Sequence, residues 1–348
     1  MYRTLKQAEG QRSRQTAAKP YKAFGATFAL SPACPIADGV YHVIGQLTPE
    51  IYEVIAVARI GALEAGGTKM VMAIGDEEGH ILERDSVPTA APEECVPPMV
   101  EWFRERNIDA LGIGAFGPTC VDPANKLFGS ILETPKTAWR YYNFRNAFVE
   151  GLHIPVGYDT DVNVACLGEA VYGAAKGLDY VVYVTIGTGI GAGVMVEGKL
   201  MHGMMHPEAG HILLKRDPED TAPSSCPYHD DCFEGLAAGP AIQKHWGKPA
   251  AELTDNPRVW NLESYYLAQG LMTYILCYSP KKIVLGGGVM HQEQLFPLVR
   301  SKVARMMNGY IVTPQMQDLD SYIVSAGCNG DQGILGALEL GKKALAEA

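Results

Sequence analysis

The chain has 348 residues, 47% of them hydrophobic and 20% charged, which is an ordinary globular composition with room for two domains. Its formal net charge of −10 argues against a general nucleic-acid binder, because such a protein needs a broad basic surface. No apolar stretch reaches the ~18–20 residues that a membrane-spanning helix needs. We therefore expect neither a nucleic-acid partner nor a membrane partner.

The eight cysteines are scattered along the chain except for Cys226 and Cys232, and no signal-peptide pattern opens the sequence. This distribution favours a reducing compartment and a metal site over a framework of disulfides. We expect a cytoplasmic protein.

The first 60 residues differ in composition from the rest. Through Lys22 they hold six basic residues and one acidic residue, Glu9, a balance that organelle transit peptides share. A disordered tail, or a start codon placed too far upstream, explains this balance more simply, although no methionine lies between Met1 and Met70. We expect residues 1–60 to form a poorly ordered N-terminal extension.

A regular pattern of apolar segments begins at Gly61. Two strands are expected to flank a glycine turn, and further strands and helices follow. In chain order these are strands at Ala62–Glu64, Met70–Ile74 and Ile81–Ser86, a helix at Pro97–Arg106, strands at Ala110–Gly114 and Val156–Tyr158, and a helix at Val162–Tyr172.

The pattern recurs in the second half of the chain. Thr68 and Thr188, 120 residues apart, each follow a glycine in a hairpin-like tip. The expected elements are strands at Tyr180–Ile186, Gly191–Val196 and Lys282–Leu285, and helices at Leu262–Leu276 and Gly333–Leu345. Two similar α/β lobes, each opening with a glycine-tipped hairpin, indicate a duplicated fold with a nucleotide in the cleft.

Glycine-rich segments mark candidate phosphate sites. The glycines of the segment Gly187–Gly193 have no side chains, so the backbone N–H groups there can approach a phosphate. The segment Gly112–Gly117 matches the Gly-x-Gly-x-x-Gly dinucleotide fingerprint, but Pro118 follows it and no amphipathic helix opens there, so we interpret it as a false match. No Gly-x-x-x-x-Gly-Lys-Ser/Thr sequence occurs, which excludes a P-loop kinase.

Two histidines and two cysteines form the second informative cluster. His211, Cys226, His229 and Cys232 can together make one tetrahedral zinc site, with Glu208 just before the first ligand. Four protein ligands leave no open position, so this zinc would be structural and would not activate water. The alternative, two free thiols and two ordinary histidines, explains the cluster less well. A phosphate cradle beside a metal-pinned polar loop indicates a phosphotransferase.

Seven segments together resemble a ROK-family sugar kinase. Five of them carry the family's motifs in order, namely Leu63–Lys69, Asp159–Asn163, Ile186–Gly191, His206–His211 and Ile283–Gly288. The other two, Gly114–Pro118 and Thr134–Trp139, are similar to the fructokinase branch. The resemblance covers about residues 61–345.

This resemblance implies an α/β fold of the actin-like ATPase (ribonuclease H-like) type, duplicated into two lobes with a nucleotide and sugar cleft. The first lobe would span residues 61–178 and be completed by a C-terminal helix at 330–348. The second would span residues 179–329 and carry the zinc-binding loop. The resemblance further implies ATP with Mg²⁺, a structural Zn²⁺, a hexose acceptor and a homodimer.

The resemblance also assigns the nucleotide site. The first phosphate loop would be Gly66, Gly67, Thr68 and Lys69, the second would be Gly187, Thr188 and Gly189, and the adenosine would pack against Gly286, Gly287 and Gly288. Taken alone, the first loop is better explained by a plain hairpin turn, and the third is explained nearly as well by a strand-to-helix turn. Glu64 stands where the wider family has Asp, and its carboxylate can still reach a Mg²⁺ or its water.

Asp161 is the expected general base, because a hexose hydroxyl attacks phosphorus only as its proton is drawn off. From the sequence alone it is equally a helix N-cap. The family pattern favours the base and gives Asp159 a structural role, while Thr160 stands where many relatives have Asn. Glu208 would accept hydrogen bonds from the sugar, with contributions from Asp161, His206 and Gly117. Asp122, Lys136 and Trp139 are candidates for the pocket rim, although a core Trp139 fits as well.

The expected reaction is phosphorylation of D-fructose to fructose 6-phosphate. The alternatives are a broader hexokinase acting on mannose, glucose or an N-acetylhexosamine, and a sugar sensor of the same family without catalysis. The segment before Gly61 shows no sustained helical periodicity, so it does not make the helix-turn-helix domain of the family's repressors.

Overall fold

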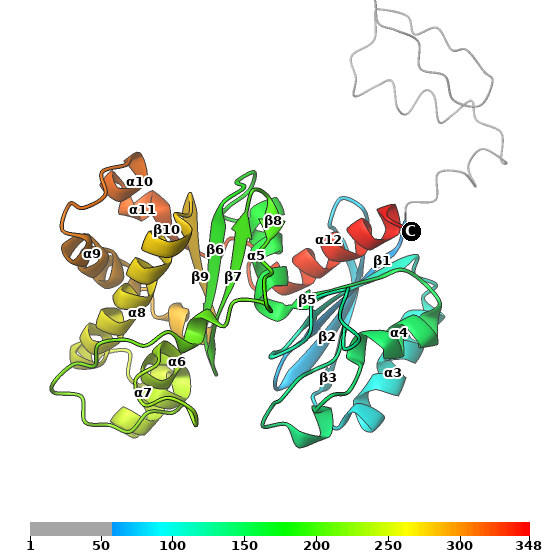
Figure 1. Ribbon diagram of the computed structural model, residues 1–348, viewed down its shortest axis with the longest axis horizontal. Helices are drawn as coiled ribbons and strands as arrows, with labels where there is room; N and C mark the ends of the chain where they lie inside the picture. The colour runs from blue at the N-terminus through cyan, green and yellow to red at the C-terminus, as the bar shows by residue number, and fades with distance from the viewer. Residues whose placement is uncertain (1–57) are drawn as a thin grey trace, which may run out of the picture. The chain divides into compact units, whose positions relative to one another are not determined.

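The computed structural model describes residues 58–348. The extension expected at residues 1–60 therefore lies outside the described residues, apart from its last three positions. Across the described part, two five-stranded sheets form the framework (Figure 1). The first holds β1 (Ile60–Ala65), β2 (Lys69–Gly75), β3 (Ile81–Pro88), β4 (Ala110–Ala115) and β5 (Val156–Thr160). The second holds β6 (Val181–Ile186), β7 (Ile190–Val196), β8 (Lys199–Leu200), β9 (Lys282–Gly286) and β10 (Ile323–Ser325).

The two sheets have the same topology. The first has the order β3-β2-β1-β4-β5 and the second the order β10-β9-β6-β7-β8, which is the same sequence of strands listed from the other edge. In the first, β1 is antiparallel to β2 and parallel to β4. In the second, β6 is antiparallel to β7 and parallel to β9. The predicted duplicated α/β fold is confirmed.

Helices cover both faces of each sheet. They are α3 (Pro92–Glu105), α4 (Phe144–Leu152), α5 (Asp161–Val171), α6 (Phe233–Ala237), α7 (Gly239–Trp246), α8 (Pro257–Tyr278), α9 (Leu295–Met307), α10 (Pro314–Gln317), α11 (Leu319–Tyr322) and α12 (Gln332–Ala346). Short 3₁₀ turns are η1 (Thr137–Trp139), η2 (Ala209–His211), η3 (Ala250–Glu252) and η4 (Gly288–His291). None of the helices in the described part is long and apolar enough to cross a bilayer.

Strand β6 shows why the second sheet is covered twice. Val182 and Val184 point into the core shared with α8 and α9, whereas Val181 and Tyr183 point into the core shared with α5. Successive side chains of a strand face opposite sides, so an unbroken apolar strand requires cover on both. Figure 1 shows α5 and α12 between the two sheets, with α12 against the first sheet.

Glycines permit the close packing of α12. A side chain at Gly112 would place its Cβ 1.9 Å from the carbonyl oxygen of Ala337, and one at Gly336 would lie 1.8 Å from the carbonyl oxygen of Val164. Backbone therefore touches backbone where α12 crosses β4 and α5. The first glycine of the apparent dinucleotide fingerprint thus has a packing function, and no helix directly follows Gly117 and Pro118.

Two helices begin earlier than predicted. The helix expected at Pro97 starts at Pro92, because Pro92 suits the first turn and the buried Cys95 and Met99 hold this segment against the sheet despite two internal prolines. The helix expected from Leu262 starts at Pro257, after an Asn256 cap whose side chain accepts a hydrogen bond from the helix. The strands agree with the predictions to within a few residues.

Candidate active site

A cavity of about 740 Å³ lies at the glycine tips of the two sheets. Its volume is that of a pocket for a small-molecule ligand. It brings together residues from distant parts of the sequence that were singled out as site candidates, namely Gly67, Gly117, Asp161, Gly187, Thr188, Gly189, His206, Glu208, His211 and His229.

Other candidates do not line this cavity. Gly66, Thr68 and Lys69 belong to the first turn, which is closed by the hydrogen bond from Gly66 N–H to the Lys69 carbonyl (3.0 Å). The run Gly286–Gly288 lies behind the second loop, where a Cβ on Gly187 would be 3.8 Å from the Gly288 nitrogen.

The chain path places Asp161 at the carboxyl end of β5, in the first turn of α5. Thr160 is the N-cap of this helix, because its hydroxyl oxygen accepts a hydrogen bond from Asn163 N–H (3.2 Å). The alternative reading of Asp161 as the N-cap is therefore wrong. The Oδ1 atom of Asp161 accepts from Val162 N–H (2.8 Å), and the side chain faces the cavity.

The surroundings of Asp161 favour its protonated form. Burial raises its pKa from 3.8 to about 7, and the nearby carboxylates of Glu64 and Glu208 act in the same direction. The Val162 N–H and His206 oppose this rise in pKa. A carboxylate with a pKa near neutrality can both accept and release a proton at physiological pH, which is what a general base requires.

Asp159, two residues earlier, is buried and does not line the cavity. Its carboxylate accepts hydrogen bonds from Thr160 N–H (2.8 Å) and Asn163 Nδ2 (2.8 Å), and it contacts His202 Nε2 at 2.9 Å. The hydrogen bond to Asp159 raises the pKa of His202. Because His202 belongs to the loop that leads to Glu208, Asp159 ties that loop to the start of α5.

His206 and Glu208 form a pair opposite Gly117. His206 Nε2 lies 2.8 Å from Glu208 Oε1. A Cβ on Gly117 would be 3.4 Å from His206 Nε2 and 3.6 Å from Glu208 Oε1, so a glycine here leaves both groups open to the cavity. His206 is buried, and its Nδ1 has no hydrogen-bond partner among the residues described.

Glu234 is a cavity residue that the sequence analysis missed. Its Oε2 accepts a hydrogen bond from Ile190 N–H (3.0 Å), and a Cβ on Gly189 would lie 2.6 Å from the same oxygen. The carboxylate thus rests on the second glycine loop. The signal available in the sequence was an acidic residue two positions after Cys232, in the first turn of α6.

The remaining candidates do not line the cavity. Trp139 is a core residue, with its indole N–H donating to the Ala90 carbonyl (2.9 Å), and the exposed Asp122 accepts from Ala124 N–H in a turn. Glu64 is largely buried against the first turn of α12, where a Cβ on Gly333 would be 2.5 Å from its Cδ atom. Burial raises the pKa of Glu64, and Lys69 opposes the rise.

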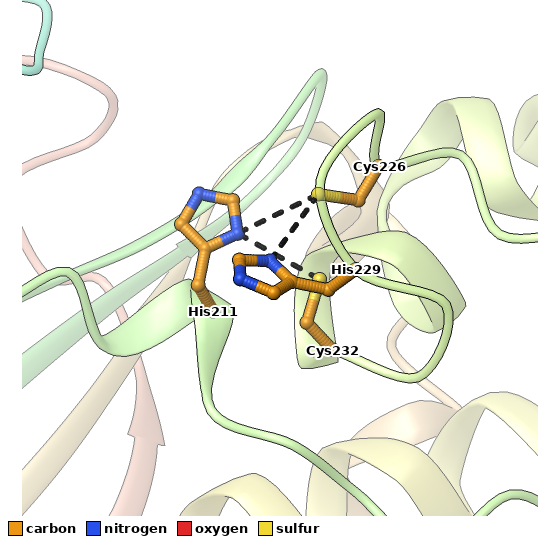
Figure 2. Close-up of side chains that lie close together, drawn as sticks. All are labelled: His211, Cys226, His229 and Cys232. Atoms are coloured by element: carbon orange, nitrogen blue, oxygen red, sulfur yellow. Dashed lines mark hydrogen bonds between the residues drawn. The ribbon is translucent and has the colours of Figure 1, made fainter.

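The four predicted zinc ligands converge (Figure 2). The Nδ1 atom of His211 lies 3.8 Å from Cys226 Sγ and 3.6 Å from Cys232 Sγ, and Cys226 Sγ lies 3.7 Å from His229 Nδ1. Zn–S bonds of ~2.3 Å and Zn–N bonds of ~2.0 Å at tetrahedral angles separate neighbouring sulfur and nitrogen ligands by about 3.6 Å. The donor set and its spacing therefore fit a tetrahedral Zn²⁺.

Backbone pairing brings the ligands into register. The segment after His211 runs beside the segment that ends in Cys232, through hydrogen bonds from Phe233 N–H to Ile212 (2.9 Å) and from Leu214 N–H to Asp231 (2.8 Å). His211 also closes the short η2 turn that follows Glu208.

Comparison with known proteins gives a consistent result. A family model described as "ROK family" matches residues 60–344. The chain is 49% identical over 287 residues to a Bacillus subtilis protein named "Putative fructokinase", covering 82% of this chain and 96% of that protein. It is 44% identical over 289 residues to a fructokinase of Pediococcus pentosaceus, covering 83% of this chain and 99% of that one. A solved ROK hexokinase from Thermus thermophilus has a TM-score of 0.69 at 25% identity, over 83% of this chain and 100% of that chain.

Proposed function

This chain belongs to the ROK family, and from that premise we propose that it is an ATP-dependent hexose kinase that converts D-fructose to fructose 6-phosphate. Relatives named fructokinase at 39–49% identity support the choice of sugar. The observation that carries the chemistry is Asp161, a carboxylate with a pKa near 7 that faces a cavity shared with two glycine loops.

In the proposed reaction, a hexose hydroxyl attacks the γ-phosphorus of ATP. The new oxygen–phosphorus bond forms as the bond from the γ-phosphorus to the β–γ bridging oxygen breaks, ADP leaves with that electron pair, and the hydroxyl proton passes to Asp161. The backbone N–H groups of Gly67 and Thr68 in the first loop, and of Thr188 and Gly189 in the second, would bind the phosphates, whereas those of Gly66 and Gly187 close the two turns. Gly286–Gly288 would support the adenosine from behind the second loop.

Carboxylates would hold the sugar. Glu208 would accept hydrogen bonds from sugar hydroxyls, with His206 fixing its orientation through the 2.8 Å contact. Glu234, which rests on the second loop, lines the same cavity. Carboxylates suit polyhydroxylated ligands because each oxygen accepts charge-assisted hydrogen bonds from neighbouring hydroxyls.

Two metals belong to the proposal. Zn²⁺ would be held by His211, Cys226, His229 and Cys232 and would fix the loop that carries Glu208. Mg²⁺ would be held by ATP phosphates, water and the carboxylate of Glu64, which leaves Asp161 free to accept the hydroxyl proton. When bound, Mg²⁺ supplies positive charge that offsets the negative charge of the phosphates.

The deciding test is an ATP-dependent coupled assay of the purified protein with fructose, mannose, glucose, N-acetylmannosamine and N-acetylglucosamine. We expect the highest kcat/KM with fructose. A preference for another sugar would retain the chemistry and overturn the sugar assignment. The absence of turnover with every sugar, with both metals present, would favour the sensor alternative. Light scattering on the same sample tests the proposed homodimer.

A further inference from the structure

The turn that precedes η1 lies against the first glycine loop. The Cε atom of Lys136 is 3.8 Å from the point at which a side chain on Gly67 would begin. Gly67 lines the cavity, and so do Glu133 and Pro135 from the segment that carries Lys136. Lys136 follows these lining residues directly in the chain, and its side chain reaches the loop proposed to bind phosphate.

Hydrogen bonds hold this turn and the glycine loop together. The backbone of Lys136 is held in place, because its carbonyl accepts a hydrogen bond from Trp139 N–H (2.9 Å). The buried Trp139 ring in turn donates a hydrogen bond to the Ala90 carbonyl (2.9 Å). The adjacent Thr89 bonds to the loop twice, from its hydroxyl to the Gly66 carbonyl (2.8 Å) and from its N–H to the Thr68 carbonyl (3.0 Å). The base of the Lys136 side chain is thus fixed relative to the loop.

The charge of Lys136 is not neutralised by the protein. Its side chain forms no ion pair and no hydrogen bond within residues 58–348, although it is partly buried. The neighbouring Glu133 lies 3.1 Å from Arg140 Nε and is paired there. An ammonium fixed beside backbone N–H donors, with no counter-ion, favours the binding of an anionic group.

Lys69, the lysine within the loop motif itself, is placed differently. Its side chain is exposed, whereas that of Lys136 is partly buried, and the charge of Lys69 acts on Glu64, whose pKa it lowers against the effect of burial. We propose that Lys136, rather than Lys69, supplies the ammonium that contacts the γ-phosphoryl group of ATP during its transfer. This inference rests on the proposed kinase function.

The chemical balance of the transfer is unchanged by this role. Lys136 keeps its proton throughout and forms no covalent bond, while the hydroxyl proton goes to Asp161 and the electron pair of the broken bond leaves with ADP. Its contribution is electrostatic, because charge on the γ-phosphoryl oxygens lies next to a fixed cation as the group moves between ADP and sugar.

The test compares Lys136→Gln and Lys136→Arg with the matched control Lys126→Gln, an exposed lysine in the same excursion between β4 and α4. We expect Lys136→Gln to lower kcat roughly 10- to 100-fold, the loss typical of one charged donor, with little change in the KM for fructose. Lys136→Arg should recover part of that loss, and Lys126→Gln should match the wild type. Equal melting temperatures establish that each variant is folded.

Nucleotide binding provides a second readout that does not depend on turnover. Lys136→Gln should weaken binding of the non-hydrolysable analogue AMPPNP more than that of ADP, because only AMPPNP carries the γ-phosphoryl position. An unchanged kcat, or an equal loss of affinity for both nucleotides, would overturn the role of Lys136. A wild type that turned over no sugar would refute the kinase proposal instead, and the ratio of AMPPNP to ADP affinities would still decide whether Lys136 reads the γ-phosphoryl group.

Discussion

Replacing Asp161 by Asn should abolish turnover and at the same time make the folded protein more stable at pH 8. The asparagine retains an oxygen to accept from Val162 N–H, so the helix start should keep its local hydrogen bond. It cannot accept the hydroxyl proton, so we expect kcat to fall by a factor of 10² or more, roughly the contribution of general-base catalysis.

The gain in stability follows from the raised pKa. Ionising Asp161 is harder in the folded protein, where its pKa is about 7, than in the unfolded chain, where it is near 3.8. Above pH 7 the ionised group therefore opposes folding, by at most about 4 kcal/mol at 1.36 kcal/mol per pKa unit. Water in the open cavity screens the charge, so we expect Asp161→Asn to gain about half of this maximum in folding free energy.

The pH dependence of this gain is its signature. As the pH falls through 7, the folded wild type binds a proton at Asp161, and the loss of stability caused by the charge becomes smaller. Below about pH 4 Asp161 is protonated in both the folded and the unfolded state, and the loss of stability disappears. Urea denaturation at pH 8 and pH 5 would measure the difference. The exposed Asp255→Asn is the matched control, because it removes the same charge without burial.

Two results would refute this reasoning. One is an Asp161→Asn variant that is no more stable than the wild type at pH 8, and the other is an equal gain at both pH values. The same pKa predicts that kcat/KM of the wild type falls about tenfold per unit as the pH drops below 7, since only the ionised form can act as base.

Three further predictions concern the cavity and its supports. Removing zinc with a chelator, or making Cys226→Ser, should lower both the melting temperature and the affinity for sugar, measured by calorimetry. Unchanged values would show that the metal does not order the loop that carries Glu208. The variant Glu208→Gln should raise the KM for fructose roughly tenfold or more while leaving ADP affinity unchanged. Gly112→Ala should cost about 2 kcal/mol or more of folding free energy in urea titrations, because its Cβ would meet a backbone carbonyl at 1.9 Å. Gly203→Ala is the control and should be neutral, because its Cβ would meet only the Met205 carbonyl oxygen at an ordinary 4.0 Å.

The strands were predictable because a short run of apolar, β-branched residues is a local property of the sequence. Strand β6 needed only its own valines and tyrosine to be found, and it was placed within one residue. The start of helix α3 was harder to predict, because prolines at 97 and 98 usually break a helix. Here the packing of neighbouring side chains against the sheet outweighs that effect. The last helix was recognised, but its contacts with β4 depend on glycines from two distant segments.

The candidate site, too, could be predicted from the sequence only in part. Asp161 could be singled out, but choosing between it and Thr160 as helix cap required the hydrogen bond to Asn163, because Asp and Thr both favour that position. Glu234 and Lys136 reach the cavity region through folds of loops that have no local periodicity. Their side chains could be placed only by long-range contacts, to Ile190 and Gly67 respectively.

The position of α12 also has a consequence for how the protein is made. Strands β1 to β5 leave the ribosome well before α12, yet one face of their sheet is covered by residues 332–346. Until then the apolar side of β1 and β4 that receives Ala337 and Leu338 stays exposed to water. The nascent first sheet should therefore depend on chaperone protection until α12 has been synthesised. Messages truncated before the codons of α12 should yield insoluble chains, even though α12 contributes none of the cavity-lining residues.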